Sequence, residues 1–197
     1  QRLPHLLAFC RCAVDIRNVD IAAASAKGIL VTQASAGFKT SVAEWIVGAM
    51  IDLGRHITYA AKVYHAGKVP EAKMGRELKG STLGIIGYGQ IARTLTPIAH
   101  ALGMSVLIHD PYATITSDDG VSTSFTSLLA QSDFVVPLAV ATQETENLIG
   151  AAAFAAMKPS AYFINASRGN LVDEVALLDA LNRGSIAGCA LDVGRAT

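Results

Sequence analysis

Charge is scarce in this sequence. Only 16% of the residues are Asp, Glu, Lys or Arg, and the 16 basic side chains are balanced by 16 acidic ones, which gives a formal net charge of zero. A surface that binds a polyanion needs a local excess of basic residues. We therefore expect no nucleic acid among the partners of the protein.

Cysteine and long apolar runs are also scarce. The three cysteines, Cys10, Cys12 and Cys189, are too few and too scattered for a disulfide framework. Cys10 and Cys12 could share one face of a strand, but no His or Cys lies at ligand spacing, so we expect buried reduced thiols in a cytoplasmic protein and no metal. The best apolar run, 45–53, is interrupted by Asp52 and is far shorter than the ~20 residues that span a bilayer. We expect no membrane segment.

Apolar residues, by contrast, make up 51% of the chain. From residue 81 onward, short apolar runs alternate with segments of helical character. The expected strands are 83–86, 105–109, 133–136, 161–164 and 189–192, and the expected helices are 90–102, 124–131, 146–157 and 173–183. This alternation predicts an α/β fold, a Rossmann-type parallel sheet with helices on both faces. Pro137 lacks a backbone N–H and is expected to shorten the third strand.

The first 80 residues have a different texture. They offer short strands at 6–10 and 28–32 around a small helix at 20–27, and then one long helix from about 41 to 65. Ser41 with Glu44 three residues on is typical of a capping box, so Ser41 is the expected N-cap of the long helix. A polar connection then leads to residue 80. The chain opens without Met or a signal-like segment, so we expect its start to be a cut.

A phosphate-binding turn is indicated by the order Gly87-x-Gly89-x-x-Ala92. It follows a buried-strand run and opens a helix, which is the context that the dinucleotide fingerprint requires. Gly87 would permit the tight turn and Gly89 the close approach of the pyrophosphate. Asp110 lies about 20 residues further on, at the end of the next strand, where an acid binds the ribose hydroxyls and disfavours the 2′-phosphate of NADP. Two alternatives stay open: Asp110 as a solvated turn residue, and a Rossmann-like domain without nucleotide.

Further segments resemble one family, the D-isomer-specific 2-hydroxyacid dehydrogenases, which include phosphoglycerate dehydrogenase-like enzymes. Residues 164–174, Ile-Asn-Ala-Ser-Arg-Gly-Asn-Leu-Val-Asp-Glu, are similar to their NxxRGxxVDE signature, and 190–193 to the LDV that follows it. Residues 41–44 resemble their SVAE segment, and 11–20 resemble RxGxGxDNxD. The likeness extends over essentially the whole chain.

The resemblance implies roles for particular residues. Arg168 would be the catalytic arginine that pairs with the substrate carboxylate and polarises the carbonyl, tasks that suit a guanidinium fork. The alternative for Arg168 is a loop arginine that caps a strand end or pairs with an acid. Asp192 would contact the nicotinamide carboxamide, and Ala166 and Ser167 would border the nicotinamide ring.

Other positions follow from the same resemblance. Gln90 and Ile91 would join Gly87 and Gly89 at the pyrophosphate. Substrate would meet the backbone around Val14 and Asp15, although the family has glycine where this chain has Ala13 and Asp15. A carboxylate at Asp15 would repel an acid substrate unless it turns away, which leaves the substrate class open.

The resemblance also exposes a gap. The family's proton donor is a His assisted by a Glu, and family spacing puts the Glu at the position of Thr197 and the His beyond it. The five histidines of this chain, His5, His56, His65, His100 and His109, match no catalytic segment. We therefore expect these 197 residues to be a catalytically incomplete part of the enzyme.

Taken with the resemblance, the sequence predicts an oxidoreductase that uses NAD to interconvert a 2-hydroxy and a 2-oxo acid. Residues 1–40 would be the tail of a substrate domain, 41–80 an interdomain helix and connection, and 81–197 the NAD-binding Rossmann domain. The resemblance implies a homodimer with the long helix near its interface. Two other hypotheses are a dinucleotide-sensing protein, like the corepressors that share this fold, and an isolated Rossmann fragment without function of its own.

Overall fold

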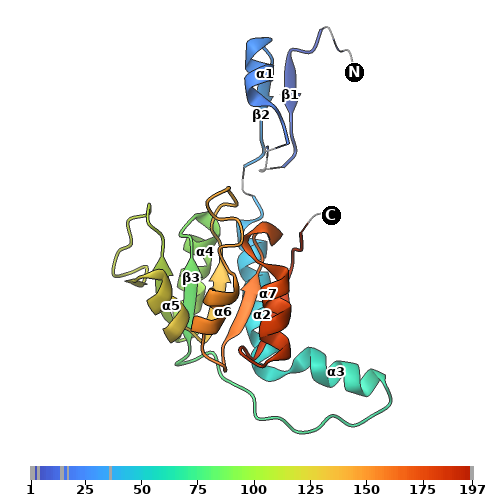
Figure 1. Ribbon diagram of the computed structural model, residues 1–197, viewed down its shortest axis with the longest axis vertical. Helices are drawn as coiled ribbons and strands as arrows, with labels where there is room; N and C mark the ends of the chain where they lie inside the picture. The colour runs from blue at the N-terminus through green and yellow to red at the C-terminus, as the bar shows by residue number, and fades with distance from the viewer. Residues whose placement is uncertain (1–2, 4, 14–15, 17, 36, 196–197) are drawn as a thin grey trace. The chain divides into compact units, whose positions relative to one another are not determined.

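The computed structural model of the chain describes residues 3, 5–13, 16, 18–35 and 37–195 (Figure 1). The chain forms two compact units, residues 1–39 and residues 40–197, and each is described by itself. No helix in the described part of the chain is long and apolar enough to cross a membrane.

The first unit is a small parallel pair of strands with one helix. Its elements are β1 (Ala8–Cys10), α1 (Ile21–Ala26) and β2 (Leu30–Thr32). Asp20 caps α1 by accepting a hydrogen bond from the backbone N–H of Ala23 at 2.8 Å. These elements confirm the strand–helix–strand pattern read from the sequence, at slightly shorter lengths.

The burial predicted for the cysteines is wrong for two of the three. Cys10 and Cys12 are exposed, and Cys189 is half-buried. The reason is that none of the described residues of the first unit is buried, because a two-stranded pair has no second layer to cover its faces. The three thiols are free, as expected.

The second unit is built on a six-stranded parallel sheet in the order β5-β4-β3-β6-β7-β8. Its strands are β3 (Thr82–Ile86), β4 (Ser105–His109), β5 (Val121–Ser122), β6 (Phe134–Pro137), β7 (Tyr162–Asn165) and β8 (Gly188–Leu191). The chain starts in the middle, moves outward to β5, and then returns to the other side of β3. This is the doubly wound order of a Rossmann fold, which confirms the predicted fold class.

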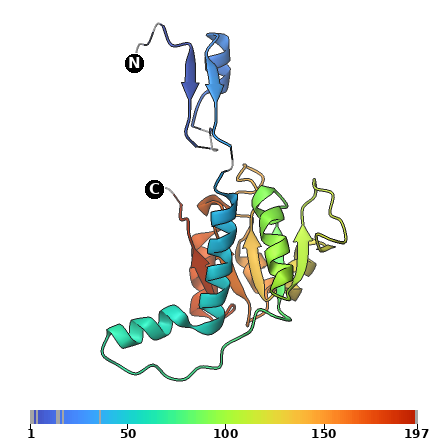
Figure 2. The ribbon, with the colours of Figure 1, turned by 180° about the vertical axis from the view of Figure 1, so that it is seen from behind.

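Helices cover both faces of this sheet. They are α2 (Lys39–Arg55), α4 (Gln90–Ala101), α5 (Phe125–Gln131), α6 (Ala151–Ala156) and α7 (Glu174–Asn182). The chain also forms α3 (Ile57–His65), which has no buried residue and extends away from the sheet, and a 3-10 turn η1 (Gly169–Leu171). Figure 1 shows α5, α6 and α7 in front of the sheet, and Figure 2, seen from behind, shows α2 and α4 in front of it.

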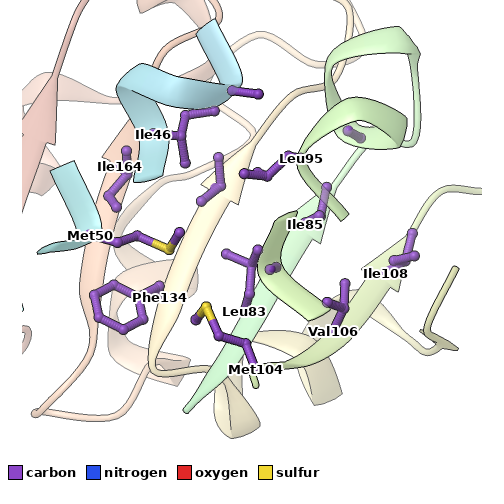
Figure 3. Packing of buried hydrophobic residues seen from close by; sticks show 14 of the residues in the cluster. Ile46, Met50, Leu83, Ile85, Leu95, Met104, Val106, Ile108, Phe134 and Ile164 are labelled. Carbon is purple, nitrogen blue, oxygen red and sulfur yellow. The ribbon is translucent and has the colours of Figure 1, made fainter. Parts of the chain in front are cut away.

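Alternation along the strands explains why the sheet is covered twice. In β6, Phe134 and Val136 pack with α2 and α4, whereas Val135 packs with the helices of the other face. In β7, Ile164 packs on the α2–α4 face and Phe163 on the other face. Successive side chains of a strand point to opposite faces, so an unbroken apolar strand supplies two cores. Figure 3 shows the core of the α2–α4 face.

The long helix predicted from 41 to 65 is wrong in two respects. It begins at Lys39, so Ser41 lies in its first turn and is not its N-cap. It also breaks at His56, which has φ 57° and ψ 36°, the left-handed conformation. Asp52 fixes the break, because its carboxylate accepts hydrogen bonds from the N–H and the hydroxyl of Thr58 at 2.6 and 2.7 Å.

Two further boundaries differ from the sequence prediction. The helix expected at 146–157 forms only over Ala151–Ala156, because Asn147 takes a positive φ of 54° and Ile149 forms a parallel bridge with Val172. Strand β6 continues through Pro137, one residue beyond the predicted end. The next amide, that of Leu138, still donates to the carbonyl of Ile86 at 2.7 Å. The proline therefore ends β6, but the residue after it stays hydrogen-bonded to the end of β3.

Candidate functional site

The carboxyl ends of the strands gather the segments that the sequence singled out. Because β3, β4, β6, β7 and β8 are parallel, the turns after Ile86, His109, Pro137, Asn165 and Leu191 lie along one edge of the sheet. The strand order switches sides at β3, with β4 and β5 on one side of it and β6, β7 and β8 on the other. Ligands of open α/β sheets bind in the crevice at such a switch point.

Gly87 closes the turn between β3 and α4 at this point. Its φ is +92°, which favours glycine, and a Cβ there would lie only 2.5 Å from the backbone nitrogen of Ala139, in the loop after β6. The Gly87 amide donates to the carbonyl of His109 at 2.8 Å, which ties the turn to the end of β4. Both conformation and space therefore require glycine here.

Gly89 is the N-cap of α4 and leaves the start of that helix open. No side chain caps the helix, and a Cβ on Gly89 would meet nothing within 4 Å. Gln90 is exposed and Ile91 half-buried at the first two helical positions. The uncapped amides and the helix dipole favour an anion. The open space at Gly89 is where a pyrophosphate could approach the backbone, so this turn fits a dinucleotide.

Asp110 follows β4 and is held by three backbone donors. Its Oδ2 accepts from the amide of Tyr88 at 2.6 Å, and its Oδ1 from the amides of Tyr112 and Ala113 at 2.8 and 3.0 Å. Burial raises the pKa of Asp110, but these three hydrogen bonds and the nearby His109 outweigh it and lower the pKa. The group is an oriented anion, and Oδ2 keeps acceptor capacity for a ribose hydroxyl.

Tyr88, to which the sequence analysis gave no role, is buried at this turn with only 3% of its surface exposed. Its hydroxyl donates to Oδ1 of Asp119 at 2.6 Å, and the guanidinium of Arg93 lies 4.5 Å from its ring centroid. Burial, followed by the hydrogen bond to Asp119, raises the pKa of Tyr88. The signal that could have found it is an aromatic residue between the two glycines, which has to be accommodated next to the ligand.

The loop after β7 is fixed by Asn165, a buried polar residue with 1% exposure. Its Nδ2 donates to the carbonyl of Arg168 at 2.9 Å, and its Oδ1 accepts from the amide of Ser167 at 3.1 Å. The Ser167 hydroxyl donates to the carbonyl of Ala139 at 3.3 Å. Since Ala139 also abuts Gly87, the loops after β3, β6 and β7 form one contact chain.

Arg168 and Ala166 take their places within this loop. Ala166 is buried with 7% exposure in the core of the α2–α4 face. Arg168 precedes η1, and its Nη1 donates to the carbonyl of Ser167 at 2.8 Å. The structure thus brings Ala166, Ser167 and Arg168 to the same edge as the Gly87–Gly89 turn, as the sequence predicted. Their roles stay predictions.

The segment after β8 packs against the loop after β7, residues 165–169, which is called the signature loop below. The amide of Asp192 donates to the carbonyl of Asn165 at 2.9 Å, which places Asp192 beside the end of β7. A Cβ on Gly169 would lie 2.3 Å from Gly194, so this glycine is required by the close approach of two backbones. Arg195 then fastens the segment through a 2.9 Å ion pair with Glu146.

Two predicted substrate residues and one histidine remain to be considered. Val14 and Asp15 lie outside the described residues. His109 ends β4, but its Nδ1 lies 3.0 Å from the carbonyl oxygen of Thr123 and its ring packs edge-on against Phe125. Across the described residues, no cluster of three or more His, Cys, Asp or Glu side chains could hold a metal ion.

Comparison with known proteins agrees with the resemblance read from the sequence. The sequence profile described as D-isomer specific 2-hydroxyacid dehydrogenase, NAD binding domain, matches residues 47–196. The chain is 40% identical over 186 residues to D-3-phosphoglycerate dehydrogenase 2 of Saccharomyces cerevisiae, covering 93% of this chain and 39% of that protein. It is 37% identical over 202 residues to (S)-sulfolactate dehydrogenase of Chromohalobacter salexigens, covering 98% of this chain and 64% of that protein.

Solved structures give the same result. The chain matches D-2-hydroxyisocaproate dehydrogenase with a TM-score of 0.91 and 28% identity, over 95% of this chain and 58% of that one. It matches D-lactate dehydrogenase with NAD+ from Lactobacillus jensenii with a TM-score of 0.83 and 29% identity, over 92% and 56% of the two chains. The chain thus spans between 39% and 64% of the length of these four proteins.

Proposed function

Because the chain belongs to the D-isomer specific 2-hydroxyacid dehydrogenases through their NAD-binding domain, we propose that it serves hydride transfer between NAD(H) and a 2-hydroxy or 2-oxo acid. The observation that carries the proposal is the turn between β3 and α4. It combines an uncapped helix N-terminus, open space at Gly89 and an anionic acceptor at Asp110 that is hydrogen-bonded to the same turn.

NAD is the cofactor of this domain family, and the residues at the turn fit it. The amides around Gly87, Gly89, Gln90 and Ile91 would hold the pyrophosphate, and Asp110 would accept from the ribose hydroxyls and repel the 2′-phosphate of NADP. The nicotinamide would lie towards Ala166, Ser167 and Asp192. When bound as NADH, the cofactor supplies the hydride that reduces a carbonyl carbon.

Arg168 is the residue of this chain that we assign to catalysis. Reduction of a carbonyl develops negative charge on its oxygen, and a guanidinium stabilises that charge while its second N–H group pairs with a carboxylate. Support comes from the loop itself, because Asn165 and Ser167 fix the Arg168 backbone and side chain through hydrogen bonds of 2.9 and 2.8 Å. A preorganised donor needs no rearrangement at the moment of reaction.

The proton that completes the reduction would come from outside these 197 residues. His109, whose backbone carbonyl accepts a hydrogen bond from the Gly87 amide of the cofactor turn, has its side chain engaged by Thr123 and Phe125. The other described histidines lie before α1, at the two ends of α3 and near the end of α4. The 197 residues would then bind NADH and hold Arg168 but would have no positioned general acid. Such an acid typically raises the rate ~10²–10⁴-fold.

We further propose that the protein forms a homodimer through α3 and the segment after it, and that it works in the cytoplasm. The first is supported by large exposed apolar side chains there, including Ile57 at 52%, Tyr64 at 62%, Val69 at 84% and Met74 at 97% exposure. Contiguous exposed apolar surface marks interaction sites. The second is supported by three free thiols.

Steady-state kinetics of the longer protein that contains these residues tests the function. It should reduce at least one of glyoxylate, pyruvate and hydroxypyruvate, whereas the 197-residue polypeptide should stay near background. Arg168→Ala should lower kcat/KM by about 10²–10³-fold, as loss of one charge-stabilising donor does, and leave NADH affinity unchanged. Arg183→Ala, an exposed arginine paired with Asp179, is the matched control and should change neither.

Two results would contradict the proposal. Loss of NADH binding in Arg168→Ala would make Arg168 a cofactor-binding or structural arginine. Robust turnover by the 197-residue polypeptide would mean that its proton donor lies among its own histidines.

A further inference from the structure

Tyr88 connects the turn between β3 and α4 to two aspartates, one through its backbone and one through its side chain. Its backbone amide donates to Oδ2 of Asp110 at 2.6 Å, and its hydroxyl donates to Oδ1 of Asp119 at 2.6 Å. Asp110 is the first residue of the connection between β4 and β5, and Asp119 is the last but one. Tyr88 therefore holds both ends of the ten-residue stretch 110–119 against the cofactor turn.

The connection is itself organised around the same two carboxylates. Oδ1 of Asp110 accepts from the amides of Tyr112 and Ala113 at its start. Oδ2 of Asp119 accepts from the amide and the hydroxyl of Thr116 at 2.9 and 2.8 Å at its end. The hydrogen bonds thus close a ring that runs from the Tyr88 amide through Asp110, along the connection to Asp119, and back to the Tyr88 hydroxyl.

The ring constrains the acceptor proposed for the ribose. Asp110 can offer its remaining acceptor site to a ribose hydroxyl only while its carboxylate plane is fixed, and the donors that fix it come from both the turn and the connection. The Tyr88 ring is 3% exposed and lies beneath the Arg93 guanidinium, so its hydroxyl has a fixed position. Opening the ring at Asp119 would free the connection and, with it, two of the three backbone donors to Asp110.

We propose that Tyr88, together with Asp119, is a positioning residue for the adenosine ribose of the cofactor, acting on Asp110 through the β4–β5 connection. This inference rests on the ribose role of Asp110 in the proposed function. It assigns Tyr88 an effect on one half of the dinucleotide only, because the nicotinamide half would be bound by Ala166, Ser167 and Asp192.

The test compares two ligands on the full chain by fluorescence titration: NADH, and reduced nicotinamide mononucleotide, which keeps the nicotinamide and lacks the adenosine. Tyr88→Phe and Asp119→Ala should each raise the Kd for NADH about 3- to 10-fold, the range for residues that act through another residue. Both should leave the Kd for the mononucleotide unchanged. The double variant should be no weaker than either single variant, because both open the same ring.

Two reference variants accompany them. Tyr162→Phe, at the start of β7 and so at the opposite end of the strand from the site, removes a tyrosine hydroxyl elsewhere and should change neither Kd. Asp110→Ser removes the acceptor itself and should weaken NADH more than Tyr88→Phe does, again without an effect on the mononucleotide.

The outcomes separate the two proposals. If Asp110→Ser leaves NADH affinity unchanged, the ribose site is wrong and the role of Tyr88 falls with it. If Asp110→Ser weakens NADH but Tyr88→Phe does not, the ribose site stands and the positioning role is wrong. If Tyr88→Phe weakens both ligands equally, Tyr88 is a structural residue of the turn, and the inference is overturned.

Discussion

Asp110 and Asp119 are carboxylates of the β4–β5 connection whose pKa is lowered mainly by hydrogen-bond donors, first among them Tyr88. The hydroxyl of Tyr88, followed by the amide and hydroxyl of Thr116, lowers the pKa of Asp119 from 3.8 to about 2. At Asp110, backbone amides overcome the effect of burial and lower the pKa as well. Hydrogen bonds to the charged form of a carboxyl have this effect.

The lowered pKa of Asp119 makes a prediction about stability in acid. A carboxyl with a folded-state pKa below its unfolded value stabilises the fold above the unfolded value and loses this contribution as the pH falls. For Asp119 the loss should therefore occur between about pH 4 and about pH 2. Asp119→Asn should lower the Tm near neutral pH and reduce its further fall over that window. Thermal unfolding followed over a pH series measures this.

Asp118→Asn is the matched control, since Asp118 is the exposed neighbour of Asp119 in the same connection. It should leave the pH dependence of the Tm unchanged. An Asp119→Asn protein whose Tm falls with acid as steeply as that of the unmodified protein would show that Asp119 is not held in the way the geometry indicates.

The places of single residues at the carboxyl edge of the sheet were predictable only where a local sequence pattern determines them, and their roles stay predictions. Gly87, Gly89 and Asp110 could be predicted because the turn, the helix start and the next strand end follow one another along the chain. The hydrogen bond of Tyr88 to Asp119 could not be predicted, because the two residues lie 31 positions apart and become neighbours only once β3 and β4 pair. Asn165 was read as part of a signature, but its bonds to Ser167 and Arg168 depend on the turn that the chain takes after β7.

At the scale of elements, the N-caps of the helices fix the ends of the loops at the carboxyl edge of the sheet. Asp173 caps α7 by accepting from the amides of Val175 and Ala176 at 3.0 and 3.1 Å. The same helix follows directly on the 3-10 turn that begins after Arg168. The cap therefore fixes the point at which the signature loop ends.

Removal of this cap should be measurable as a loss of stability. Asp173→Ala should lower the free energy of unfolding by about 1 kcal/mol, as lost N-caps typically do. Asp179→Ala, in the middle of the same helix, breaks only an exposed pair with Arg183 and should cost about 0.4 kcal/mol. Urea denaturation of the two variants checks the difference, and equal midpoints would contradict the capping role.

Strands were predicted more closely than helices, and for a physical reason. A buried parallel strand is an apolar run with clear ends, so β4 was predicted at its observed bounds and the other long strands within one residue. The break at His56 was not predicted, because the glycine near it, Gly54, lies within α2, and the break depends on the hydrogen bonds from Thr58 to Asp52. The two-residue strand β5 is too short to leave an apolar pattern.

At the scale of the whole molecule, the doubly wound parallel sheet is the framework of the larger unit. Alternation of strand and helix along the chain predicted a parallel sheet with helices on both faces, since parallel neighbours need a crossover. The strand order and the register depend on contacts between distant segments, such as Leu83 with Val106 and Phe134. These were not in the sequence pattern. The order places the Gly87–Gly89 turn at the switch point between β3 and β6, where the account puts the cofactor.

NADH titration of Gly89→Ala tests whether the dinucleotide lies on the turn between β3 and α4. Gly89 has φ −83°, which any residue adopts, and an added Cβ would contact no atom of the protein within 4 Å. The variant should therefore fold with an unchanged Tm. It should nevertheless lose NADH affinity by about tenfold or more, because the methyl group occupies the space through which the pyrophosphate approaches the backbone.

Gly48→Ala, on the exposed side of α2 and equally free of contacts, is the matched control. It should leave NADH affinity unchanged and raise stability by about 0.5–1 kcal/mol, since alanine is the better helix former. If the pyrophosphate lies at Gly89, NADH binding is weakened in Gly89→Ala alone, with both proteins folded. Unchanged NADH affinity in a folded Gly89→Ala protein would contradict it, because the dinucleotide would then not lie on the turn between β3 and α4.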